Sequence, residues 1–220
     1  MVLGHSVQGR GITATEVGDF DSPRKTLVVG CIHGNECAGI AVAGRLARAA
    51  APAESDIWIV PDLNPDGRAA GTRGNARGVD LNRNFPWRWR RLGGLYDSGR
   101  RPFSEPETRL AYRLIARVRP SVTIWFHQHL DVVDDSTGSR AIERRFARTA
   151  GLRLASLTRE PGSAVTWQSH CFPRATAFVV ELPAGTLAPA ATTRLVRAVD
   201  GAAARAPAAP SGARACKAGR

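Results

Sequence analysis

The sequence feature that most constrains the fold is a series of five short apolar runs rich in β-branched residues, with helical patterns between most of them. The runs lie at 12–17, 26–31, 56–60, 121–126 and 177–182 and read ITATEV, TLVVGC, DIWIV, SVTIWF and AFVVEL. Runs of this length and composition are typical of buried strands. Strands that alternate with helices predict an α/β domain, a three-layer α/β/α sandwich in which helices cover both faces of a mixed sheet.

Apolar residues at helical spacing predict helices over 36–49, from 104 to 119, over 140–150 and over 191–204. The second begins with SEPE, which is typical of a capping box formed by Ser104 and Glu107, and it ends before Pro120. A chain of 220 residues is long enough for one sizeable core and short for two. We expect one domain over 1–201 and a disordered tail, rich in alanine, proline and arginine, over 202–220.

The formal net charge of +12 is carried almost entirely by arginine, because the chain has only two lysines, Lys25 and Lys217. Such a charge can indicate an anionic partner such as nucleic acid. Arginine bias beside many alanines is also typical of GC-rich coding, and we do not expect a nucleic-acid partner. The densest basic stretch, over 87–101, interleaves aromatic residues with arginine. It suits either a solvated loop or an anion-binding surface.

No apolar stretch approaches the roughly 20 residues of a membrane-spanning helix, and the N-terminal residues lack the apolar segment of a signal peptide. As written, the sequence predicts a cytoplasmic protein, or a secreted one if the true start lies upstream; it does not predict an oligomeric state. The four cysteines are Cys31, Cys37, Cys171 and Cys216, and they form no CxxC pair. They are interpreted as buried free thiols or, alternatively, as including a bridge from Cys37 to Cys171.

Candidate metal ligands follow the second apolar run, where the chain reads HGNE over 33–36. His33 follows the end of a strand and Glu36 opens the next predicted helix, so both side chains can converge above one edge of the sheet. Gly34 is expected to let the backbone turn between them. Because a catalytic zinc takes three protein ligands and keeps an open position, a third ligand must come from elsewhere.

The third ligand is expected to be His127, which lies where the strand SVTIWF ends at its carboxyl end. His129 lies on the same face of an extended chain and is the fallback. A single zinc ion held by two histidines and a glutamate lowers the pKa of water toward about 7 and so provides a nucleophile at neutral pH. Another divalent ion could occupy such a site in vitro. Glu181 ends another apolar run, and it is the candidate proton shuttle or, alternatively, a salt-bridged strand end.

The segment over 64–86, NPDGRAAGTRGNARGVDLNRNFP, is rich in Arg, Asn, Asp and Gly. It suits either a solvated loop or a substrate-binding one. Arginine binds a carboxylate through two parallel hydrogen bonds, and asparagine can donate beside it. A loop with Arg73, Asn82 and Arg83 could therefore hold the anionic end of a substrate and polarise a carbonyl.

Five motifs together resemble the M14 family of zinc carboxypeptidases, and most closely its short bacterial branch of murein peptide amidases. They are HGNE, NPDG, GVDLNRNFP, FHQH and FVVELP, and the resemblance runs from about residue 5 to about residue 186. It implies an α/β/α sandwich around a mixed, mostly parallel sheet of eight strands. It also implies a peptide or murein-peptide substrate with a free terminal carboxylate, cut at a C-terminal peptide bond or a γ-D-glutamyl-diaminopimelate bond.

The resemblance also implies a role for each candidate residue. His33, Glu36 and His127 match the zinc ligands, Glu181 the general base and Arg73 the arginine that stabilises the oxyanion. The residues that match substrate-binding positions are Asn82 and Arg83, for the terminal carboxylate, and Val165, for side-chain preference.

The sequence departs from the family pattern in a loop that usually carries a tyrosine, because 157–173 contains none and Leu157 stands near its place. Asn35 also replaces the arginine or aspartate often found in the ligand motif. Two other functions remain open. One is an N-acyl amino acid deacylase of the aspartoacylase and desuccinylase type, which shares the HxxE and DLNR motifs. The other is a non-catalytic basic binding module.

Overall fold

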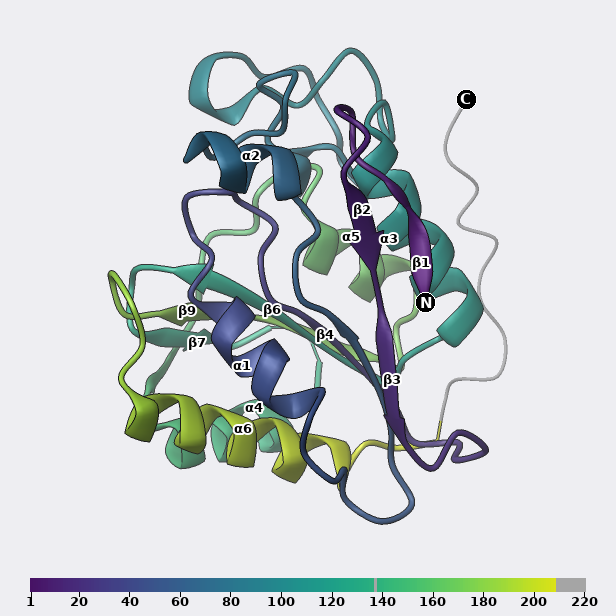
Figure 1. Cartoon of the computed structure of the whole chain (residues 1–220), viewed down its shortest axis with the longest axis vertical. Helices are drawn as coiled ribbons and strands as arrows, with labels where there is room; N and C mark the ends of the chain where they lie inside the picture. Colours follow the sequence, from purple (N-terminus) through teal and green to yellow (C-terminus); the bar gives the residue numbers. More distant parts are fainter. Residues whose placement is uncertain (137, 209–220) are drawn as a thin grey trace.

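The computed structural model describes residues 1–136 and 138–208. Its centre is a mixed sheet with the strand order β3-β5-β4-β6-β9-β7-β8 (Figure 1). The strands are β3 (Thr15–Gly18), β4 (Lys25–Val29), β5 (Asp56–Val60), β6 (Val122–Gln128), β7 (Val132–Asp134), β8 (Arg153–Ala155) and β9 (Thr176–Leu182). A separate antiparallel hairpin consists of β1 (Val2–His5) and β2 (Gly11–Thr13).

All five predicted strands are present, but the expected count of eight strands in the sheet is wrong for the described residues, which form a sheet of seven. The run over 12–17 divides at Ala14. Ile12 pairs with Gly4 in the hairpin, whereas Thr15 pairs with Ile59 in the sheet. The strands on either side of this division therefore belong to two sheets.

Helices cover both faces of the sheet, as the α/β/α prediction requires (Figure 1). The elements α1 (Gly39–Leu46), α4 (Arg140–Ala150) and α6 (Pro189–Ala203) lie on one face, and α3 (Pro106–Val118) and α5 (Ala164–Cys171) on the other. Side chains alternate along each strand. Val28 and Ile124 pack into the core under α1, α4 and α6, whereas Leu27 and Trp125 pack into the core under α3 and α5.

The starts of the first two predicted helices differ from the prediction. α1 begins at Gly39 rather than at 36, because residues 31–38 form a loop. The predicted capping box at α3 is wrong, because Ser104 Oγ donates to the Glu105 carboxylate and makes no bond to the helix. The carboxylate of Glu107 instead accepts hydrogen bonds from Val7 N and Asn75 Nδ2.

α6 ends at Ala203, and Ala206 beyond it is buried against the same core. The predicted tail thus begins inside a helix, and its residues 209–220 lie outside the described residues. Among the residues that the structure does describe, no helix is both long and apolar enough to span a membrane.

The central strands β5, β4, β6 and β9 run parallel, so their carboxyl ends lie at one edge of the sheet. The connections that leave this edge include α2 (Pro65–Ala70) and the two short 3-10 helices η1 (Leu81–Arg83) and η2 (Gly94–Tyr96). Every candidate ligand and catalytic residue predicted from the sequence belongs to a strand end or loop at this edge. In a sheet of this kind, ligands bind there.

Candidate metal and active site

Three potential ligand atoms converge above the carboxyl ends of β4 and β6. Glu36 Oε2 lies 2.9 Å from His33 Nδ1 and 3.1 Å from His127 Nδ1, and the two Nδ1 atoms are 3.1 Å apart. All three side chains are buried or nearly so. These residues form a group that could hold a metal ion.

The chemistry of this donor set suits zinc. Donor atoms about 2.0 Å from a tetrahedral zinc lie about 3.3 Å from one another, close to the spacing observed. Without a cation, two imidazole nitrogens would face each other, and at most one proton could lie between them. His129, the fallback ligand, is exposed and is not in the group.

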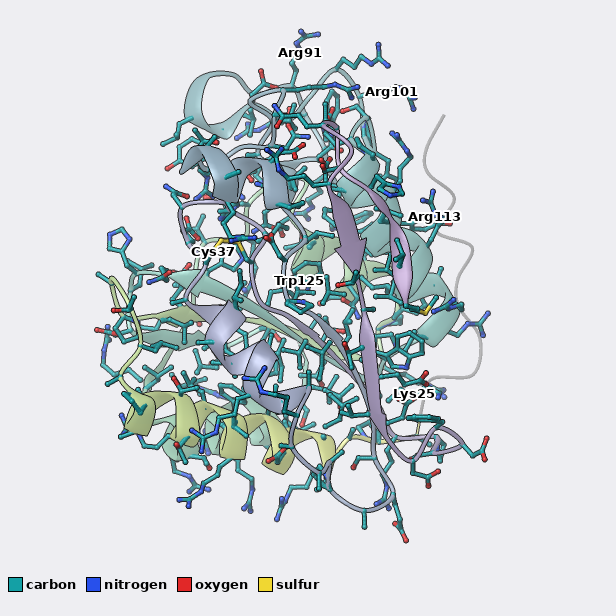
Figure 2. The ribbon with its side chains drawn as sticks, viewed as in Figure 1. Lys25, Cys37, Arg91, Arg101, Arg113 and Trp125 are labelled. Atoms are coloured by element: carbon teal, nitrogen blue, oxygen red, sulfur yellow. A yellow bond between two sulfur atoms is a disulfide. The ribbon has the colours of Figure 1, made fainter. Side chains whose placement is uncertain are left out.

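The loop that carries His33 and Glu36 is closed by a disulfide between Cys31 and Cys37. Figure 2 labels Cys37 beside the yellow sulfur atoms, above the strand ends. This pairing contradicts both expectations for Cys37, a free thiol or a bridge to Cys171; Cys216 lies outside the described residues. Gly34 is needed for close packing rather than for a turn, because a Cβ there would lie 1.9 Å from the carbonyl carbon of Gly67.

Asp80 supports the metal-ligand group and was not predicted from the sequence. Its Oδ1 lies 2.9 Å from His33 Nε2, on the far side of the ring from the other ligand atoms. A carboxylate in this position fixes the orientation of a ligating histidine. Burial alone would raise the pKa of Asp80, but the charges of His33, Arg73 and Arg83 outweigh it and lower that pKa.

Arg73 bridges the two carboxylates. Its Nη1 donates to Glu36 Oε1 over 2.7 Å, and its Nε donates to Asp80 Oδ2 over 2.9 Å. The bond to Oε1 leaves Glu36 Oε2 facing the two histidines. Burial would raise the pKa of Glu36, but hydrogen bonds from His127 and His33 outweigh it and lower that pKa well below its usual range.

Glu181 is the neighbour of His127 across the parallel pair β6 and β9. Its Oε2 is buried without a hydrogen-bond partner among the described residues. Burial, together with the charge of Glu36, raises the pKa of Glu181 to about 7. No arginine or lysine within the described part of the chain forms a salt bridge with it, contrary to the alternative of a salt-bridged strand end.

The three predicted substrate-binding residues line the cavity that also contains the metal-ligand group and Glu181. This cavity has a volume of about 390 Å³. Asn82 Oδ1 accepts from Ala164 N, which ties η1 to the start of α5, beside Val165. Arg83 is 7% exposed, and its nearest carboxylate oxygen among the described residues, from Glu160, is 3.8 Å away.

Sequence reasoning also missed Tyr96, Asp134 and Arg159, which line the same cavity. The signal for Asp80 was its place directly before the LNRN motif, whereas nothing local marked Tyr96. That residue belongs to the stretch 87–101, which forms an ordered loop with Ser98 at its centre. Ser98 Oγ accepts from Leu92 N, and Ser98 O accepts from Asn84 Nδ2.

Comparisons with known proteins agree on one family. The family model described as zinc carboxypeptidase matches residues 1–134. Murein peptide amidase A from Escherichia coli strain K12 is 31% identical over 187 residues, which cover 74% of this chain and 77% of that protein. Murein peptide amidase A from Vibrio campbellii is 34% identical over 134 residues, or 54% of each chain.

Solved structures resemble this fold over nearly its whole length. The crystal structure of the murein-tripeptide amidase from Escherichia coli O157 has a TM-score of 0.79 and 26% identity, and the match covers 94% of this chain and 92% of that one. Carboxypeptidase A from Helicoverpa armigera has a TM-score of 0.78 at 19% identity, with 94% of this chain and 68% of that one covered. The second similarity concerns the fold alone.

Proposed function

Because the chain belongs to the zinc carboxypeptidase family and is therefore a zinc-dependent peptide-bond hydrolase, we propose that it cuts murein stem peptides. The bond broken is the amide before a C-terminal residue with a free carboxylate, of the γ-D-glutamyl-diaminopimelate type. The observation that carries this proposal is one cavity lined by the metal-ligand group, Glu181, Asn82 and Arg83. Two relatives named as murein amidases support the choice of substrate.

In this proposal, His33, Glu36 and His127 hold the zinc ion, with Asp80 fixing the ring of His33. When bound, zinc acts as a Lewis acid that activates water and polarises the scissile carbonyl. The support is the spacing of the three donor atoms, none of which is more than 3.1 Å from the next.

Glu181 is proposed as the general base that takes a proton from the attacking water and passes it to the leaving amine. A pKa of about 7 suits both halves of this task at neutral pH, because the carboxylate can accept a proton and release it again. The position of Glu181 beside His127 supports the assignment.

Arg73 is proposed to stabilise the developing oxyanion, and Asn82 and Arg83 to bind the terminal carboxylate of the substrate. The support for Arg83 is a buried guanidinium with no carboxylate oxygen of the described residues closer than 3.8 Å. A substrate carboxylate would supply the missing counter-charge through two parallel hydrogen bonds. Val165 is buried in the cavity wall and is proposed to contact the side chain of the departing residue.

The charges in the cavity wall support diaminopimelate as that departing residue. Its side chain ends in an amino group and a second carboxylate, so a site that binds it must offer both a negative and a positive group. Glu160 is 41% exposed in the cavity, and Arg159 is held beside it by hydrogen bonds to the Asp134 carboxylate and to Asp135 O. A wall of this kind suits a zwitterionic side chain better than an apolar one.

The two alternatives are less well supported. A binding module has no need of Glu181, whose buried Oε2 has no hydrogen-bond partner in the described part of the chain, beside a complete ligand group. A deacylase of the aspartoacylase type shares the ligand motif, but the similar proteins named above are murein amidases and a carboxypeptidase.

The location of the protein is a separate proposal, to which the Cys31–Cys37 disulfide contributes. Disulfides persist mainly in oxidising compartments, so the pairing supports a location outside the reducing cytoplasm. Thiol labelling of protein recovered from separated cell fractions, with and without reductant, tests this. Quantitative labelling of Cys31 and Cys37 before reduction would contradict the proposed location.

The experiment that tests the proposed function is mass spectrometry of products from the zinc-loaded protein. A murein tripeptide and a panel of ordinary peptides are incubated with and without a chelator, beside Glu181→Gln as the inactive control. Chelator-sensitive release of diaminopimelate is the expected result. If only the ordinary peptides were trimmed, the proposed substrate would be overturned. If no peptide of either kind were cleaved, the proposed function would be overturned.

A further inference from the structure

The side chain of Tyr96 contacts both arginines that the proposed function assigns to the substrate. Tyr96 ends the 3-10 helix η2 and lines the cavity of the metal-ligand group. The centre of its ring lies 5.3 Å from Arg73 Cζ and 5.4 Å from Arg83 Cζ. At these distances the negative face of the ring attracts a guanidinium.

The contact of Arg83 with the Tyr96 ring uses none of the hydrogen-bond donors of the guanidinium group. Arg83 Nη1 donates to Asn82 O over 3.0 Å, and the nearest carboxylate oxygen among the described residues is 3.8 Å from its Nη2. A ring over the face of a guanidinium leaves the donors at its edge available. Tyr96 can therefore attract the Arg83 guanidinium without using the hydrogen bonds that a substrate carboxylate needs.

Tyr96 is itself fixed to the segment that it contacts. The next residue, Asp97, accepts a hydrogen bond through its backbone carbonyl from Asp80 N over 2.8 Å. Asp80 caps the start of η1, which carries Asn82 and Arg83. The ring and the two guanidinium groups are thus parts of one connected loop structure, even though Tyr96 is 49% exposed.

The chain has only one other tyrosine, and its location differs. Tyr112 packs among aromatic core residues, with its ring 5.0 Å from Phe103 and 5.7 Å from Trp167. The ring of Tyr96 instead lies at the cavity, where it contacts the two guanidinium groups, and this placement favours a role in binding over a role in packing.

We propose that Tyr96 is a positioning residue that makes the enzyme selective for substrates with a free terminal carboxylate. Its ring orients Arg83 toward the terminal carboxylate of the substrate, beside Arg73, which Glu36 and Asp80 already hold in place for the developing oxyanion. This inference rests on the proposed function, because it assumes that Arg83 binds the terminal carboxylate. The hydroxyl group is not required, since the contact is made by the ring.

The test compares Tyr96→Leu and Tyr96→Phe with the wild type on a murein tripeptide and on the same tripeptide with its terminal carboxyl group amidated. Leu95→Ala is the matched control, because Leu95 is a 66% exposed neighbour that does not line the cavity. Zinc content and melting temperature are measured for every variant. These two readouts report a general structural effect separately from an effect on the substrate.

With Tyr96→Leu we expect the KM for the free tripeptide to rise roughly 10-fold, with a smaller change in kcat, because a cation–π contact to a desolvated arginine is lost. The ratio of kcat/KM for the free over the amidated tripeptide should fall by a similar factor. Tyr96→Phe and Leu95→Ala should keep the wild-type ratio. An unchanged ratio in Tyr96→Leu, or an equal loss on both substrates, would overturn the proposal.

Binding is measured as well, so that the inference does not depend on turnover. Calorimetry compares the free and the amidated tripeptide on zinc-loaded Glu181→Gln and on the double variant with Tyr96→Leu. A preference for the free tripeptide that disappears in the double variant supports the role of Tyr96, even if the wild type cuts neither substrate and the proposed function fails. A preference that survives the loss of the ring overturns it.

Discussion

At the scale of single residues, the electrostatics of the site centre on Glu36. One of its oxygens accepts from Arg73, and the other faces the Nδ1 atoms of His33 and His127. Arg73 is in turn held by Asp80, which also fixes His33. Each of these bonds removes a rotational freedom from a group that would face the metal, so the site is organised before zinc binds.

Asp80→Asn tests this organisation. The amide is a weaker acceptor for the His33 ring and carries no charge for Arg73, so we expect the affinity for zinc to fall roughly 10- to 100-fold. Competition with a chromogenic chelator measures the change. Asp62→Asn is the matched control, since Asp62 pairs with Arg68 and does not line the cavity. Wild-type zinc affinity in Asp80→Asn would contradict the role given to Asp80.

Glu181→Gln tests the electrostatic cost of the proposed base in the metal-free protein. Burial raises the pKa of Glu181 from 4.5 in the unfolded chain to about 7 in the folded one. Below pH 4.5 both states are protonated and the carboxyl group costs nothing. As pH rises from 4.5 to about 7, the unfolded chain ionises first and the wild type loses stability; above this range the loss is complete.

The side chain of the glutamine variant does not ionise. The free energy of unfolding of this variant should therefore increasingly exceed that of the metal-free wild type as pH rises from 4.5 to about 7. Because the group is only half-buried, we expect a gain on the order of 1 kcal/mol at about pH 8 and almost none at about pH 4. Urea unfolding in the presence of a chelator measures it. A gain that is the same at both pH values would show that ionisation of Glu181 is not its source.

The sequence alone indicated which polar residues lie at or just beyond the carboxyl ends of the parallel strands. These residues are His33, Glu36, His127 and Glu181. The carboxyl ends of parallel strands lie at one edge of the sheet, and this does not depend on the conformation of the loops. Asp80 and Tyr96 could not be predicted in the same way. Asp80 lies 47 residues from His33 in the sequence, and the path of the loops brings them together.

At the scale of elements, the long apolar strands were predictable and the short elements were not. β7 and β8 have three residues each, and α2 has six, too few to show a clear period. The capping box at α3 failed because tertiary contacts outweigh a local motif. The Glu107 carboxylate accepts hydrogen bonds from Val7 and Asn75, which lie in other parts of the chain.

The loop between β4 and α1 is the element on which the ligand geometry most depends. The Cys31–Cys37 bond closes a loop that contains two of the three ligands, with a sequence separation of 6 residues. Replacing both cysteines by serine should lower the free energy of unfolding by about 2 kcal/mol, the value that loop-closure entropy gives for so short a loop. Denaturant unfolding of the metal-free protein measures this loss.

The same double variant should also bind zinc less tightly, because its ligand loop must be ordered when the ion binds. The control is the wild type treated with reductant, which should behave like the variant in both respects. A double variant that matches the oxidised wild type in stability and in zinc affinity would show that the disulfide does not organise the loop.

At the scale of the whole molecule, the net charge of +12 favours the approach of an anionic substrate. Figure 2 shows arginine side chains, among them Arg91 and Arg101, on the outside of the loops that cover this edge of the sheet. Such a charge raises the rate of encounter at low ionic strength, and salt screens it over about 10 Å at 0.1 M.

The dependence on salt is therefore a test of steering. For the anionic murein tripeptide we expect kcat/KM to fall severalfold between about 0.02 M and about 0.3 M salt, with little change in kcat, because encounter is slowed and chemistry is not. A peptide with no net charge serves as the control and should show little dependence. Equal salt effects on both peptides would mean that the basic surface does not assist this substrate.

The most direct test of the central claim is a zinc titration of the metal-free protein, followed by bound zinc per chain and by hydrolysis of the murein tripeptide. We expect activity to rise in proportion to zinc and to stop rising at one ion per chain, and we expect His127→Ala neither to retain the ion nor to become active. Hydrolysis by the metal-free protein, or full zinc binding by His127→Ala, would contradict the central claim.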